Sequence, residues 1–97
     1  MLDIKKTQEG SKLEFSLEGR LDTTTAPELE AELKESGTDL LLDFAKLSYI
    51  SSAGLRVLLS TQKAVNAANG SMTIVNVNEE IMEVFDMTGF SSFLTIA

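Results

Sequence analysis

Cysteine and histidine are both absent from the 97 residues of this chain. Without cysteine, the chain can form no disulfide and has no thiolate to act as a nucleophile or a metal ligand. Without histidine, it lacks the commonest general base and cannot build a serine–histidine–aspartate triad. Carboxylate and lysine chemistry remain open. These absences count against an enzyme, and we expect neither a cofactor nor a metal.

Long apolar runs are also missing. No window approaches the roughly 18 apolar residues of a membrane span, and no apolar signal core follows the N-terminal segment 1–6. We therefore expect a cytoplasmic protein with no membrane insertion. The net charge of −7 would repel nucleic acid, so no nucleic-acid partner is expected. The negative charge could serve solubility alone, or it could attract a basic patch on a protein partner.

The pattern of apolar residues predicts a chain of alternating strands and helices. Residues 12–18 alternate strictly between apolar and polar, which is typical of a half-buried strand. The weaker segment 3–8 pairs with it as a hairpin. Residues 39–44 are largely apolar, which indicates a central strand covered on both faces. Two further segments follow: 72–77 as a strand, and 93–96 as a last strand or a packed tail.

Helices are predicted near 26–36, 53–69 and 79–88. Thr25 and Glu28 have the spacing of a capping box, and Pro27 suits a first helical turn. Asn78 and Gly89 suit the two ends of the last helix. The sequence therefore predicts one α/β domain over residues 1–97. Its sheet has four or five strands, is mixed and mostly parallel, and has helices packed against it.

Two serines, Ser51 and Ser52, lie at the expected start of the 53–69 helix. Functional sites of α/β sheets lie beyond the carboxyl ends of strands, where the connecting segment 47–55 is expected. A helix start tolerates negative charge, so a phosphoserine would be accepted there. Either serine could instead be an ordinary N-cap. Gly54 has no side chain, so a partner could approach its backbone closely.

A second segment, 19–26, also follows a strand and precedes a helix. If the two strands are parallel neighbours, this segment lies beside 47–55, and Asp22 lies near Ser51 and Ser52. Asp22 could also be a turn aspartate that bonds its own backbone. The sequence leaves both roles open.

Three motifs in order resemble the STAS family, and within it the bacterial anti-sigma-factor antagonists. The first is Gly19-Arg20-Leu21-Asp22 with Ala26 and Leu29. The second is Leu42-Asp43-Phe44 followed by Tyr49 to Leu55, and the third is Phe85 to Phe90. The resemblance covers nearly the whole chain.

The resemblance implies a partner switch. The unmodified form binds an anti-sigma factor that is also a serine kinase, and this binding releases a sigma factor. The kinase then phosphorylates a serine, which falls on Ser52, and a serine phosphatase resets the switch. The family's loop aspartate falls on Asp22. The expected partner-binding residues are Asp22, Thr23, Ser51, Ser52, Ala53, Gly54 and Arg56.

One departure from the family pattern is Ser51, which stands where such antagonists usually carry aspartate. It makes Ser51 an alternative phosphorylation site. It also leaves room for another role, a non-phosphorylated STAS accessory subunit of a transport or signalling complex. An unrelated small-molecule binder or enzyme is the third hypothesis, which the missing histidine and cysteine disfavour.

Overall fold

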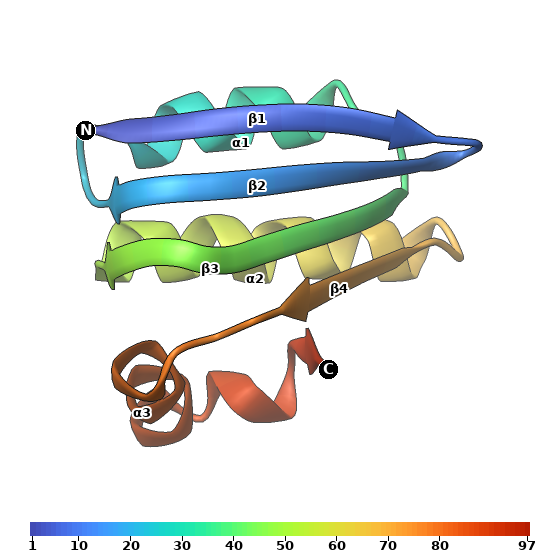
Figure 1. Cartoon of the computed structure of the whole chain (residues 1–97). Coiled ribbons are helices and arrows are strands. Elements are labelled where there is room, and N and C mark those ends of the chain that lie inside the picture. Colours follow the sequence, from blue (N-terminus) through green and yellow to red (C-terminus); the bar gives the residue numbers. More distant parts are fainter.

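The computed structural model describes all 97 residues as five strands, three α-helices and one short 3-10 helix (Figure 1). No helix is long and apolar enough to cross a lipid bilayer. In chain order the elements are β1 (Leu2–Glu9), β2 (Lys12–Leu21), α1 (Ala26–Lys34), β3 (Asp39–Ile50), α2 (Ser52–Ala67), β4 (Ser71–Val75), α3 (Glu79–Thr88), the 3-10 helix η1 (Phe90–Ser92) and β5 (Thr95–Ile96).

The strands form a single sheet in the order β1-β2-β3-β4-β5. β1 and β2 are an antiparallel hairpin, and the other three neighbouring pairs are parallel. This confirms the mixed, mostly parallel sheet. The segment expected as a last strand or a packed tail contributes β5, which pairs with β4.

The helices cover one face of the sheet. α1 and α2 lie behind the strands in Figure 1, and the near face carries no helix. Each parallel connection steps one strand in the same direction, so right-handed crossovers place their helices on the same side. On β3, Leu42 and Phe44 are buried, whereas Leu41 and Asp43 are half-buried. The expectation that β3 is covered on both faces is therefore wrong.

Both β2 and β3 run further than the sequence pattern predicts. The segments 19–21 and 45–50, expected as loops, continue the two strands. The register of the β2–β3 pairing shifts at two places along β2, one from Ser16 to Glu18 and one from Gly19 to Arg20. Such bulges break the alternation that marks a strand in sequence: Ser48 and Tyr49, for example, are both exposed. The expected loop 47–55 is therefore mostly strand end and helix start.

The three helices lie close to their predicted positions. α2 begins one residue and ends two residues before the predicted bounds, and α1 ends two residues early. α3 occupies the predicted range. The Asn78 carboxamide oxygen accepts a hydrogen bond from the Ile81 N–H at 2.9 Å, and Gly89 ends the helix at φ +80°. The helix η1 was not predicted.

The core consists of 21 buried apolar residues between the sheet and the helices. α3 joins it through Phe85, whose ring centroid is 6.5 Å from that of Phe44 on β3. One buried amide, Gln62 of α2, accepts a hydrogen bond from the Thr95 N–H at 3.3 Å. This bond fixes the two-residue strand β5 against α2.

Candidate functional site

The carboxyl ends of β2 and β3 bring the two predicted segments together. Leu21 and Ile50 are the last paired residues of the two parallel strands. Beyond them, the Ser51 N–H donates to the Leu21 carbonyl oxygen at 2.9 Å. The segments 22–25 and 51–52 therefore lie side by side at one end of the sheet, as expected from the parallel pairing (Figure 1). We call this end of the molecule the rim.

The two rim serines differ in their environments. Ser51 is the N-cap of α2: its backbone is extended, and its hydroxyl accepts a hydrogen bond from the Gly54 N–H at 3.4 Å. Ser52 is the first residue of the helix and is exposed. Its hydroxyl makes no hydrogen bond within the chain, so of the two it is the freer to react.

Asp22 is held by its own turn. Its Oδ1 accepts hydrogen bonds from the Thr24 hydroxyl at 2.8 Å, the Thr24 N–H at 3.1 Å and the Thr25 N–H at 3.1 Å. These donors, the Thr24 hydroxyl foremost, hold the pKa of Asp22 below its ordinary value despite some desolvation. Asp22 is thus a turn aspartate that bonds the backbone of its own turn, as one of the two predicted roles required. Its carboxylate stays charged at neutral pH.

The capping box predicted for Thr25 and Glu28 is not formed, because Thr25 makes no side-chain cap hydrogen bond. The Thr25 hydroxyl instead accepts from the Asp22 N–H and donates to the Arg20 carbonyl oxygen, both at 2.9 Å. The Ala26 N–H already donates to the Asp22 carbonyl oxygen at 2.8 Å, so helical turns begin at Asp22. Asp22 therefore accepts from the N–H groups of Thr24, Thr25 and Ala26, while the Glu28 N–H donates to the Thr25 carbonyl oxygen at 3.0 Å.

Gly54 does not offer its backbone to a partner, because the surrounding chain buries it. A Cβ atom at this position would lie 2.7 Å from Leu21 Cγ and 3.0 Å from Ile50 Cγ1. The missing side chain lets α2 pack closely over the ends of β2 and β3. The expected direct role of Gly54 in partner binding is corrected to a packing role.

The remaining predicted residues lie along the same rim. Thr23 is exposed in the turn after β2, and Ala53 is half-buried in the first turn of α2. Arg56 is exposed one turn further along α2, and no carboxylate lies within 4 Å of its guanidinium. The rim therefore presents Asp22, Thr23, Ser52 and Arg56 to solvent, while Ser51 and Gly54 support them.

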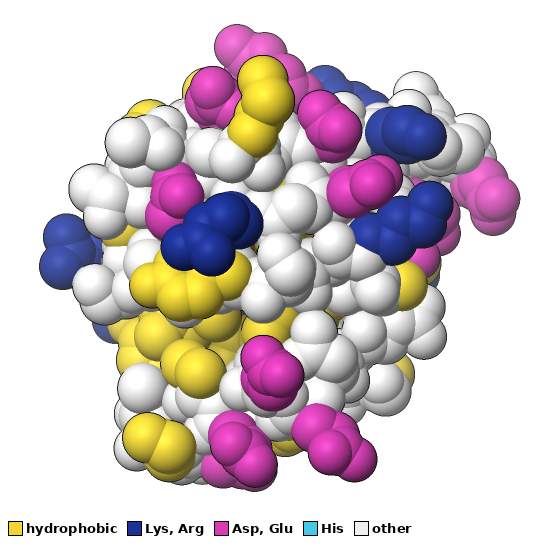
Figure 2. Space-filling model, turned by 60° about the vertical axis from the view of Figure 1, so that its left-hand side comes forward, with side chains coloured by type: hydrophobic (Ala, Val, Ile, Leu, Met, Phe, Trp, Pro, Cys, Tyr) yellow, Lys and Arg dark blue, Asp and Glu magenta, His cyan; other side chains and the backbone are white.

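Sequence reasoning missed the pairing of Arg20 with Tyr49. The two residues are opposite each other in the β2–β3 pairing, and the Arg20 guanidinium lies 4.1 Å from the centroid of the Tyr49 ring. Arg20 Nε is also 3.8 Å from Asp22 Oδ2, and Tyr49 is 40% exposed. Figure 2 turns this end of the molecule forward and shows basic side chains beside hydrophobic surface, with acidic side chains above and below. No motif signals this pair, because it depends on the strand register.

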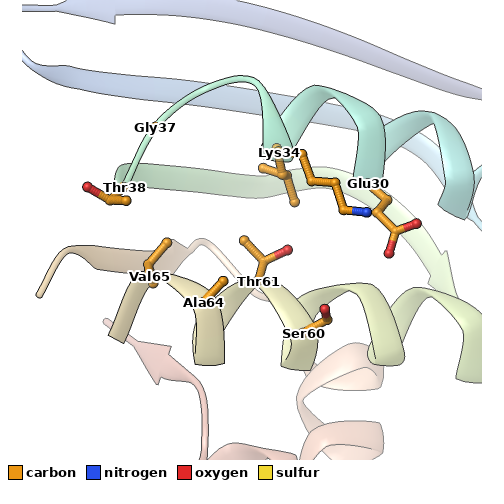
Figure 3. Close-up of a pocket in the computed structure, with 9 residues that line it drawn as sticks. Glu30, Lys34, Gly37, Thr38, Ser60, Thr61, Ala64 and Val65 are labelled. Carbon is orange, nitrogen blue, oxygen red and sulfur yellow. The ribbon is translucent and has the colours of Figure 1, made fainter. Parts of the chain in front are cut away.

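Shallow hollows rather than an enclosed cavity surround the rim. The hollow beside it is lined by Ser48, Asn78, Glu79 and Glu80, without a hydrophobic residue. A cavity of about 270 Å³ lies between α1 and α2, near the amino end of β3 (Figure 3). No cluster of three or more acidic side chains could hold a metal ion. The rim itself suits contact with another protein better than capture of a small ligand.

Comparison with known proteins places this geometry in a family. The STAS domain model matches residues 3–97. The chain is 30% identical to the anti-sigma-B factor antagonist of Bacillus subtilis, covering 99% of this chain and 89% of the relative. It is 33% identical to the antagonist of the same name from Staphylococcus epidermidis, covering 98% of this chain and 92% of the relative.

Solved structures of the antagonist SpoIIAA have the same fold. The unphosphorylated form matches with a TM-score of 0.79 at 17% identity, over 98% of this chain and 87% of SpoIIAA. The phosphorylated form, from Bacillus, matches with a TM-score of 0.76 at 19% identity, over 98% and 91%. With the family model and the full-length relatives, these matches show that the chain belongs to the STAS domain family, among the anti-sigma-factor antagonists.

Proposed function

We propose that this protein is an anti-sigma-factor antagonist that is switched off by phosphorylation of Ser52. In its unmodified form it binds an anti-sigma factor with serine kinase activity through the rim, and the bound sigma factor is released. The names of the relatives, which are anti-sigma-B factor antagonists, support an anti-sigma factor as the partner. The protein acts by binding in the cytoplasm, and the catalysis belongs to its partners.

The observation that carries the proposal is the exposed hydroxyl of Ser52 beside a serine that is already engaged as a cap. The kinase transfers the γ-phosphoryl group of ATP to Ser52 Oγ: the new O–P bond forms, ADP leaves, and a base on the kinase takes the hydroxyl proton. The phosphorylated form of SpoIIAA shows that this fold accepts such a group in that relative. A serine phosphatase removes it and restores binding.

The departure at Ser51 is compatible with this function. Aspartate and serine are both good N-caps, so serine keeps the start of α2 in place. The change removes one negative charge from the surface that meets the kinase. It therefore alters the choice of partner and leaves the geometry of Ser52 unchanged.

Mass spectrometry tests the proposal directly. The purified protein is incubated with a candidate kinase-type anti-sigma factor and ATP, together with the variants Ser52→Ala and Ser51→Asp. We expect one phosphate on Ser52 in the wild type and in Ser51→Asp, and none in Ser52→Ala. Phosphate on Ser51 would move the switch by one residue. A complex without phosphate on either serine would support the accessory-subunit role instead.

A further inference from the structure

We propose that Arg56 captures the phosphate on Ser52, so that the modification removes a cation from the rim as well as adding an anion. The inference rests on the proposed phosphorylation of Ser52 and concerns how that modification acts. It gives this chain a second residue in the switch.

Ser52 and Arg56 lie on the same face of α2. Four residues in an α-helix are about 40° apart around the axis and about 6 Å apart along it. Both side chains are exposed, whereas Leu58 and Val65 are buried on the opposite side of the helix. A phosphate on Ser52 would therefore stand within reach of the guanidinium, with the anion N-terminal to the cation. This is the favourable order for a pair spaced by four residues.

Arg56 is free to make this contact. The ion pairs of the chain are Lys6 with Glu32 and Arg20 with Asp22, and neither involves Arg56. The α2 segment contains no aspartate or glutamate, so no carboxylate on the helix competes for the guanidinium. Guanidinium groups bind phosphate through two parallel hydrogen bonds, which a lysine cannot match.

The other arginine of the rim is already held. The Arg20 guanidinium is stacked on Tyr49 and faces Asp22 on the β2–β3 side. The acidic side chains that face the rim, Asp22, Glu79 and Glu80, belong to the segment after β2 and to α3. None of these groups is on α2, so the pairing of Ser52 and Arg56 can be tested without disturbing them.

The consequence for the partner follows from the same pair. In the unmodified protein, Arg56 offers its guanidinium to an acceptor on the kinase. In the phosphorylated protein, the phosphate occupies that guanidinium. The partner then meets a new anion and loses a donor.

Phosphorus NMR tests the pairing on protein that carries phosphoserine encoded at position 52. The phosphate pKa, ordinarily near 6, is measured in the wild-type background and in Arg56→Gln, Arg20→Gln and Lys63→Gln. Lys63 is the matched control, because it lies on the same exposed face of α2 but about 16 Å from Ser52 along the helix axis. We expect Arg56→Gln to raise the phosphate pKa by about 0.3. The other two substitutions should leave it nearly unchanged.

An equal shift in Arg56→Gln and Lys63→Gln would overturn the proposal, because it would reflect net charge alone. A larger shift in Arg20→Gln would assign the capture to Arg20. If the kinase modifies Ser52 but Arg56→Gln leaves the titration unchanged, the capture is wrong and the switch stands. If no kinase modifies Ser52, the proposed function fails, while the encoded phosphoserine still shows whether the pair forms.

Discussion

Ser51 and Ser52 are neighbours of the same residue type, but their side chains differ in hydrogen bonding. The Ser51 hydroxyl accepts from the Gly54 N–H, and its backbone N–H is bonded to Leu21. Ser52 is the first residue of α2, and its side chain is exposed. Spacing alone predicted a cap and an anion-tolerant position within this pair without assigning them, and only the family resemblance pointed to Ser52 as the phosphorylation site.

Replacing Ser51 separates capping from phosphorylation. Ser51→Ala should lower the free energy of unfolding by about 0.5–1 kcal/mol, at the lower end for a lost N-cap because the hydrogen bond is long. Ser51→Asp should retain stability. Chemical denaturation of both variants measures the difference. Equal stabilities for Ser51→Ala and Ser51→Asp would show that the side chain does not cap α2.

Asp22 gives the turn a pH dependence. Its folded-state pKa is lowered, so its contribution to stability is present above its unfolded pKa near 4 and is lost as the pH falls through the lower folded value. The side-chain amide of the Asp22→Asn variant cannot titrate. We therefore expect wild type to lose stability relative to Asp22→Asn as the pH is lowered from 5 to about 2. A constant difference across that range, measured by urea denaturation, would contradict the turn geometry.

The elements that form the rim are longer than the sequence pattern indicates. Alternation predicted the regular part of β2 and a run of apolar residues predicted that of β3. Both signals stopped where the bulges near Gly19 and Ala45–Lys46 break the period of two. Helix ends were predicted closely, because Asn78 and Gly89 are local signals. The Arg20–Tyr49 stack and the burial of Gly54 depend on how β2, β3 and α2 meet, and short-range patterns do not contain that information.

Gly54 tests the packing of α2 on those strand ends. Gly54→Ala should lower the free energy of unfolding by about 1–3 kcal/mol, since the new methyl group would overlap Leu21 and Ile50. This cost should exceed the modest helix-propensity gain of alanine near a helix start. Ser60→Ala, at an exposed position of the same helix, is the control and should change stability by less than about 0.5 kcal/mol. A stabilised Gly54→Ala variant would mean that α2 does not approach the strands so closely.

At the scale of the molecule, the fold holds the exposed Ser52 at one end of the sheet. The α/β class and the mixed sheet follow from the order of strands and helices, and the resemblance covering the chain pointed to the same family. One-sided coverage of the sheet was not foreseen, because the largely apolar run 39–44 is also typical of a strand covered on both faces. Phosphate on Ser52 would lie outside the core, so we expect it to change binding and leave the fold intact.

The most direct test of this switch is calorimetric titration of the cognate anti-sigma factor with unmodified protein and with protein carrying phosphoserine at position 52. In the complex the phosphate would be stripped of water against a surface that fits a hydroxyl. A poorly paired buried charge costs about 2–5 kcal/mol, so the Kd should rise by about 30- to 4000-fold. Circular dichroism should show the same fold for both proteins, and Ser52→Ala should bind like the unmodified form. Equal affinities for the unmodified and phosphorylated proteins would contradict the switch.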